Sequence, residues 1–157
     1  MILGWIAAAA LVLGLVGLDR FALAFIRPPH KPVEVTPADS GLEHREVEFL
    51  AGGVTLRGWI LLPPAGISPL PPAVLTHGWT GTSGLLLPLG VELARSGAPT
   101  LVFDVRGHGR SEAAGYVTAR HFRDDVMAAA ACLASECEAE AVVLVGHSMG
   151  GAASILA

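Results

Sequence analysis

The stretch Ala141-Val-Val-Leu-Val-Gly-His-Ser-Met-Gly-Gly-Ala-Ala153 decides the fold of this chain. Its first five residues, 141–145, are apolar and predict a strand buried on both faces, as in a parallel sheet covered by helices. Residues 146–150 match the pattern G-x-S-x-G, and the small and apolar run 151–157 predicts a helix. In the order strand, tight turn and helix, this pattern indicates a nucleophile elbow with the Ser148 hydroxyl above the sheet.

Two further motifs precede this stretch. His77-Gly78-Trp79 follows the apolar segment 73–76, and Asp104-Val-Arg-Gly-His-Gly-Arg-Ser111 follows the apolar segment 100–103. Together with Gly-His-Ser-Met-Gly-Gly at 146–151, they stand in the order and at spacings that resemble the α/β-hydrolase fold enzymes. The resemblance runs from about His44 to the last residue. It implies an α/β architecture in which helices flank a mostly parallel sheet.

The remaining segments agree with this architecture. Loose alternation in both arms around a turn at Gly52-Gly53 predicts an antiparallel pair at a sheet edge, over 45–50 and 54–62. A proline-rich loop, 63–72, leads to the first buried strand. Apolar residues at helical spacing predict helices over 85–95 and within 116–135. Strands that alternate with helices favour βαβ units and right-handed crossovers.

Ser148 is the candidate nucleophile. A serine hydroxyl needs an adjacent base to take its proton, and the developing oxyanion needs N–H donors. One donor is the backbone N–H of Met149, directly after the nucleophile; by resemblance, the second is that of Trp79. Gly78 lets the backbone approach the substrate, and we assign Gly78 and His147 to substrate binding.

The catalytic base is not among the nearby histidines by the family's pattern. By the resemblance, His77 belongs to the loop that supplies an oxyanion donor, and the family uses the histidine at the position of His108 structurally. The strained turn should point the side chains of His147 and Ser148 apart. The family's order is serine, acid, then histidine, yet the nine residues 149–157 contain no Asp, Glu or His. We therefore expect the N-terminal part of a longer hydrolase, incomplete at the C-terminus. The alternative is a truncated or non-catalytic member that binds without turnover.

The composition of the chain limits the kinds of molecule that it is expected to bind. The formal net charge is −4 and no run of Lys or Arg occurs, which argues against nucleic acid. Cys132 and Cys137 have neither metal-site spacing nor the number needed for a disulfide framework. The expected partner is a small-molecule acyl substrate, with no metal and no organic cofactor. The sequence specifies neither the substrate nor the oligomeric state.

The N-terminus predicts a membrane anchor. Residues 2–18 contain no charge, and after Asp19-Arg20 the apolar run resumes over 21–26. The whole is long enough for a single transmembrane helix through residues 2–26. One alternative is a signal peptide cleaved after Ala22-Leu-Ala24, which would give a secreted or periplasmic protein. Another is a buried core helix.

The expected organisation has three parts: a transmembrane anchor at 1–26, a Pro-rich linker at 27–43, and the N-terminal part of a hydrolase domain at 44–157. Arg20, Arg27 and Lys31 follow the uncharged run, and no charged side chain precedes it. The positive-inside rule therefore places the domain on the cytoplasmic side.

Overall fold

The computed structural model describes residues 2–65 and 69–157, so part of the predicted loop 63–72 lies outside the described residues. Its elements in chain order are α1 (Ile2–Ile26), the 3₁₀ turn η1 (Pro37–Ser40), β1 (His44–Ala51), β2 (Val54–Leu61), β3 (Ala73–Thr76), α2 (Ser83–Arg95), β4 (Thr100–Asp104), α3 (Ala119–Glu136), β5 (Val143–Gly146) and α4 (Met149–Leu156).

These elements form a sheet in the order β1-β2-β4-β3-β5. The hairpin β1–β2 turns at Gly52 and Gly53, whose φ angles of 59° and 86° suit a two-residue turn with positive φ at both central positions. β2 is antiparallel to β4, whereas β4, β3 and β5 run parallel. The described sheet is therefore mixed rather than mostly parallel, because the hairpin supplies two of its five strands.

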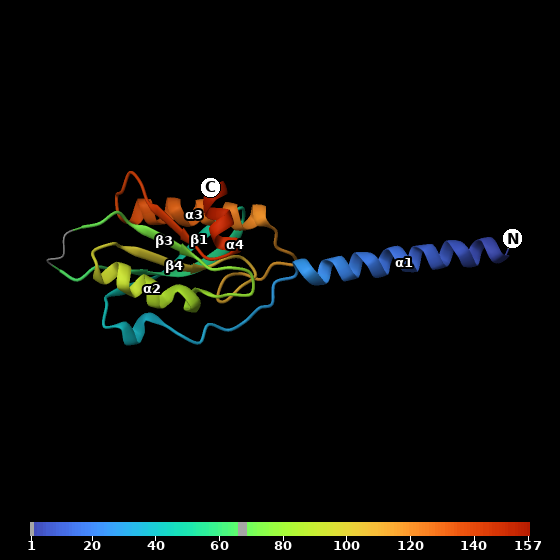
Figure 1. Ribbon diagram of the computed structural model, residues 1–157, viewed down its shortest axis with the longest axis horizontal. Helices are drawn as coiled ribbons and strands as arrows, with labels where there is room; N and C mark the ends of the chain where they lie inside the picture. The colour runs from blue at the N-terminus through green and yellow to red at the C-terminus, as the bar shows by residue number, and fades with distance from the viewer. Residues whose placement is uncertain (1, 66–68) are drawn as a thin grey trace.

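Helices cover both faces of this sheet (Figure 1). Alternate residues of β4 point to opposite faces, as the pleat requires. Leu101 and Phe103 pack in a core with Phe122 and Val126 of α3, and Val102 packs in a second core that α2 covers. α4 lies beside α3 on the same side of the sheet. The loops that carry the three motifs meet at the carboxyl ends of the parallel strands.

The expectation that the strand at 141–145 is buried on both faces is wrong for the described chain. β5 begins at Val143, whose side chain is 48% exposed, and its other residues are only half-buried. The reason is its position: β5 pairs with β3 alone and is an edge of the described sheet. An apolar run identifies a strand but does not show how many neighbours it has.

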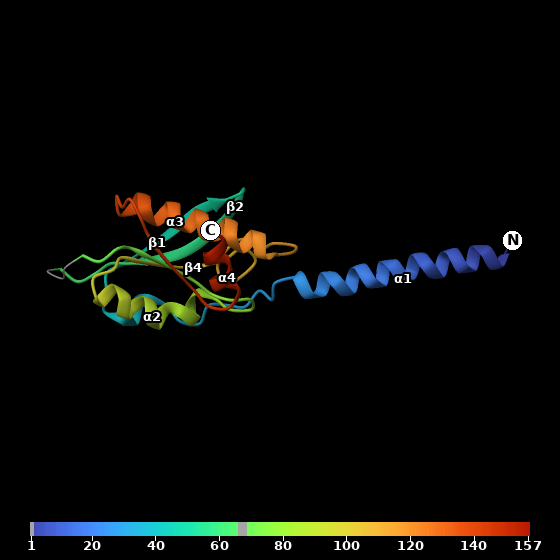
Figure 2. The same ribbon diagram turned by 45° about the horizontal axis from the view of Figure 1, so that its top comes forward.

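α1 extends away from the domain as one long helix (Figures 1 and 2). None of its most apolar stretch is buried, so α1 is not a core helix of the domain that the structure describes. Among the described residues it is the one helix long and apolar enough to cross a membrane, with a mean hydropathy of 2.0 over Gly4–Ile26. A membrane span and a signal sequence both satisfy these criteria.

The segment 27–43 follows the surface of the domain. Pro28 packs against Gly107, and His30 Nδ1 lies 3.3 Å from the Gly107 carbonyl oxygen. At the other end, Arg95 donates to the carbonyl oxygen of Ser40 at 2.9 Å. The segment has no helix or strand before the 3₁₀ turn η1, and it contacts the domain at both ends.

Candidate active site

Ser148 occupies a backbone conformation that few L-residues adopt, with φ 54° and ψ −117°. It stands between the end of β5 and the first residue of α4, and its side chain is exposed. The turn is tight, since the Gly150 N–H donates to the His147 carbonyl oxygen at 3.0 Å. The strand–turn–helix arrangement predicted for G-x-S-x-G is therefore present.

The two glycines of this pattern are required by close contacts. A Cβ atom on Gly146 would collide with the backbone of Gly150, and one on Gly150 would collide with the carbonyl oxygens of Thr76 and His77. Gly150 thus lets the start of α4 lie directly on the end of β3. This contact fixes the nucleophile turn relative to the loop that follows β3.

That loop brings Gly78 and Trp79 to the serine. A Cβ atom on Gly78 would lie 3.0 Å from Ser148 Cβ and 3.3 Å from His147 Nδ1. Among the described residues, the backbone hydrogen bonds of turns and loops include none donated by the N–H of Trp79 or Met149. Met149 directly follows Ser148 at the first position of α4, where helical N–H groups have no partner within the helix, and Trp79 directly follows Gly78.

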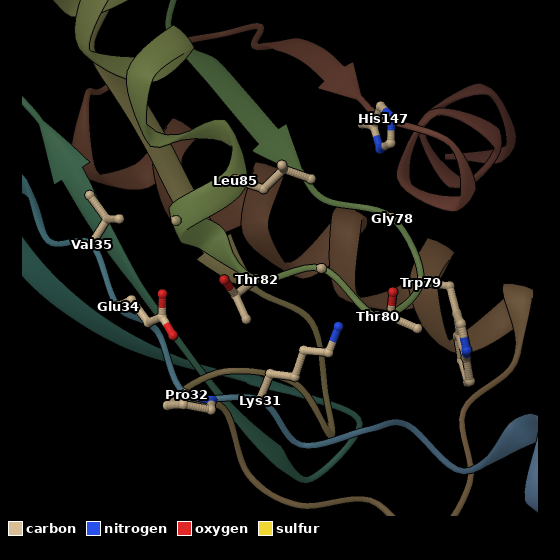
Figure 3. Close-up of a pocket in the computed structure, with 12 residues that line it drawn as sticks. Lys31, Pro32, Glu34, Val35, Gly78, Trp79, Thr80, Thr82, Leu85 and His147 are labelled. Carbon is tan, nitrogen blue, oxygen red and sulfur yellow. The ribbon is translucent and has the colours of Figure 1, made fainter.

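Four of the predicted site residues line two cavities next to the nucleophile turn, and Ser148 itself lines neither. Gly78, Trp79 and His147 line a cavity of about 600 Å³, and Figure 3 shows the loop of Gly78 between His147 and Lys31. Sequence reasoning did not include Lys31, which comes from the segment 27–43. Trp79 and Met149 line a second cavity of about 440 Å³. Only the tertiary structure shows that both cavities adjoin the nucleophile turn.

His77 has a structural role. The ring is fully buried, with Nδ1 2.8 Å from the Gly78 carbonyl oxygen and Nε2 3.2 Å from the backbone N–H of Val105. Nδ1 therefore carries the proton and donates, while Nε2 accepts. Burial lowers the pKa of His77 to about 4, although the carbonyl of Gly78 and the nearby Asp104 favour the charged form. Both ring nitrogens are engaged, so neither can take a proton from Ser148.

His108 is also buried and lies against the indole of Trp79, with ring centroids 5.5 Å apart. Its Nδ1 is 3.0 Å from the carbonyl oxygen of Arg106, which therefore accepts from it. Burial lowers the pKa of His108. This ring supports the side chain of Trp79.

Asp104 and Arg106 hold the loop after β4. Asp104 accepts from the backbone N–H of Ser83 at 2.6 Å and of Arg110 at 3.1 Å. Arg106 forms an ion pair with the buried Asp125, which also accepts from the Arg106 backbone N–H at 2.9 Å. Burial raises the pKa of Asp125, and the Arg106 guanidinium opposes that rise. Through these contacts, the side chains of Asp104 and Arg106 in the motif 104–111 hold the loop after β4 in its conformation.

Among the described residues, no group of three or more His, Cys, Asp or Glu side chains is placed to hold a metal ion. Cys132 and Cys137 are free thiols, and burial raises the pKa of each. Both lie at the end of α3, remote in sequence from the loop of Gly78 and Trp79.

The mixed sheet, the glycine-lined turn and the loop after β3 define an α/β-hydrolase fold. The family described as "Serine aminopeptidase, S33" matches residues 70–157, more than half of the chain, and the chain belongs to this family. A search of curated proteins finds no significant match.

Solved structures agree with this assignment. The esterase Pf2001 from Pyrococcus furiosus superposes with a TM-score of 0.70 at 26% identity, over 82% of this chain and 52% of that one. The chain thus spans about half the length of this relative. Est1E from Butyrivibrio proteoclasticus, solved with ferulic acid, gives a TM-score of 0.59 at 23% identity, over 70% and 45%. The epoxide hydrolase VrEH1 from Vigna radiata gives a TM-score of 0.53 at 23% identity, over 72% of this chain and 32% of that one. The last two likenesses show the fold alone.

Proposed function

We propose that the protein is a serine hydrolase that cleaves a carboxylic ester, a thioester or an amide through an acyl-enzyme on Ser148. The observation that carries this proposal is the conformation of Ser148, strained at φ 54° and exposed at the start of α4. Strain of this kind persists where the surrounding structure enforces it, and it concentrates at functional sites. The likeness to an esterase at 26% identity supports the same class of reaction.

The proposed reaction has two stages. Ser148 Oγ attacks the carbonyl carbon and loses its proton to a base; the tetrahedral intermediate then collapses, and the alcohol, thiol or amine departs with a proton. Water next adds to the acyl carbon, and the acid product leaves Ser148 free. The backbone N–H groups of Trp79 and Met149 would donate to the oxyanion in both stages. Met149 directly follows Ser148, Trp79 directly follows the Gly78 that lies against Ser148, and among the described residues neither N–H donates a backbone hydrogen bond of a turn or loop.

We propose that neither His77 nor His108 is the base. Both nitrogens of His77 are engaged, and His108 is buried against Trp79. We propose that the acid and the histidine follow Ala157, in the part of its relatives' length that the chain does not span. Gly78 and His147 would contact the substrate, since both line the larger cavity beside Ser148.

Labelling by a fluorophosphonate tests the nucleophile in the full-length protein. We expect the wild-type protein to react and Ser148→Ala to lose both labelling and hydrolysis of p-nitrophenyl acetate, by about 10⁴-fold or more. Undiminished labelling of Ser148→Ala would remove Ser148 from this role. A wild-type protein that binds acyl ligands without turnover would favour the non-catalytic alternative.

We also propose that residues 1–26 anchor the protein in a membrane, with the linker 27–43 and the domain from 44 on the cytoplasmic side. The length and mean hydropathy of α1 support a span, and the positions of Arg20, Arg27 and Lys31 support the orientation. A signal sequence is the alternative.

A further inference from the structure

The last turn of the N-terminal helix α1 forms part of the wall of the cavity beside Trp79 and Met149. One side is the last turn of α1, with Phe25 and Ile26, and another is the start of α3, with Ala119. The cavity measures about 440 Å³, which lies within the range of roughly 300–1,000 Å³ typical of small-molecule sites. Thr118 apart, its lining side chains are apolar.

The last turn of α1 is fixed on the domain. The carbonyl oxygen of Ile26 accepts from the backbone N–H of Val117 at 2.8 Å. Directly afterwards, Pro28 packs on Gly107, where a Cβ atom would collide with the proline ring. The end of α1 is therefore a built part of the cavity, held by a hydrogen bond and by the packing of the proline that follows.

Part of the apolar wall of this cavity is exposed, although the ring of Phe25 contacts Phe21 along α1. Phe25 is 67% exposed and Ile26 36% exposed, although both belong to the segment held against the domain. Covering such side chains with an apolar group is favourable by about 25 cal/mol for each Å² removed from water. An acyl chain is such a group.

The larger cavity beside the nucleophile turn has a mixed lining, in which polar side chains join apolar ones such as Val35 and Leu85. Lys31, Glu34, Thr80 and Thr82 line it together with His147, and Figure 3 shows Lys31 and Glu34 on the segment that runs opposite the loop of Thr80. Trp79 belongs to both cavities. The nucleophile turn thus adjoins two cavities through His147 and Met149, one with an apolar lining and one whose lining also contains Lys31 and Glu34.

We infer that the last turn of α1 forms part of the acyl pocket, and that the substrate is an amphiphile: an apolar acyl chain ester-linked to a polar alcohol. The chain contacts Phe25, Trp79 and Met149, while the polar alcohol lies towards Lys31 and Glu34. This inference rests on the proposed function, and it adds the substrate class and a new role for Phe25. Because α1 is the proposed membrane span, the pocket lies where the helix leaves the bilayer, within reach of membrane-resident esters.

The test compares two phenylalanines of α1 in the full-length protein, reconstituted in phosphatidylcholine nanodiscs. Phe25 lines the cavity; Phe21 is similarly exposed, at 64%, and touches Phe25 one turn away, with ring centroids 5.0 Å apart, but does not line it. The measured quantity is the ratio of kcat/KM for p-nitrophenyl octanoate to kcat/KM for p-nitrophenyl acetate. A ratio cancels differences in protein yield and anchoring.

We expect Phe25→Ala to lower this ratio about tenfold, since an apolar wall of the chain pocket is lost, and Phe21→Ala to leave it within about twofold. Ala119→Phe, which fills the cavity from α3, should lower the ratio as well. An unchanged ratio in both cavity variants would overturn the inference, and so would an equal fall in Phe25→Ala and Phe21→Ala, which would indicate partition into lipid. If the wild-type protein hydrolyses neither ester, or does so without Ser148, the proposed function itself fails.

Discussion

Gly78 lies against Ser148 so closely that a Cβ atom on the glycine would stand 3.0 Å from the Cβ atom of the serine. The two residues follow the ends of neighbouring parallel strands, β3 and β5, whose register pairs Thr76 with Gly146. This register brings the loop of Trp79 and the nucleophile to one point. Several expected effects of substitution depend on it.

Gly78→Ala should slow ester hydrolysis by about 10²-fold, because the added methyl group displaces either Ser148 or the loop of Trp79. The melting temperature should change little, since the site faces a cavity. Gly115→Ala is the control: no atom lies within 4 Å of the added methyl group there. Equal rates in the two variants would contradict the close approach of the loop to the nucleophile.

Gly150→Ala should destabilise the fold by about 3 kcal/mol, because the methyl group meets the Thr76 and His77 carbonyl oxygens and must push α4 off β3. Gly84→Ala in α2 is the matched control. Its methyl group has no neighbour closer than 3.5 Å, and alanine favours the helix by up to about 1 kcal/mol. Urea unfolding followed by circular dichroism measures both; a Gly150→Ala protein as stable as Gly84→Ala would refute the packing argument.

Acidification should destabilise the domain between pH 6.5 and about 4. His77 is neutral in the folded state because burial lowers its pKa from 6.5 to about 4, so in this interval the unfolded chain binds the extra proton. The stability that depends on neutral His77 is fully present above pH 6.5 and is lost as pH falls, by up to about 3 kcal/mol. His108, whose pKa burial also lowers, changes the stability with pH in the same direction.

Asp125 changes the stability of the domain with pH in the opposite direction. Its raised pKa means that the folded state takes up a proton first as pH falls, which offsets part of the histidine effect at the acidic end. Urea midpoints at about pH 7.5, 6.0 and 5.0, which cover the upper part of this pH interval, measure the net dependence of stability on pH. The His77→Gln variant should show a shallower slope, and a midpoint in the wild-type protein that is constant over this range would contradict the assignment of a neutral His77.

The N-terminal helix should keep the protein in the membrane pellet after carbonate washing. Its uncharged run and mean hydropathy support this result, and residues 21–26 extend the span beyond Asp19 and Arg20. Sequencing of the mature N-terminus distinguishes the two alternatives: a start at Phe25 would establish a cleaved signal sequence. Digestion of the domain by external protease in spheroplasts would contradict the cytoplasmic placement.

Much of the local structure could be predicted from the sequence. Gly146 and Gly150 mark the nucleophile turn, Gly52-Gly53 mark the hairpin, and the apolar run 73–76 coincides with β3. These features are local: a turn that needs positive φ or lacks room for a Cβ atom restricts the residue type at that position, and burial on the sheet requires the apolar run. The family followed from three such motifs in order.

Only the tertiary structure decided which surfaces meet. In the structure β5 is an edge of the described sheet, both nitrogens of His77 have hydrogen-bond partners, and Lys31 and Phe25 line cavities that adjoin the nucleophile turn. These contacts join residues that lie far apart in the sequence, and no local pattern encodes them. They depend on how helices and loops pack on the sheet, and that packing sets the shape and polarity of the candidate site.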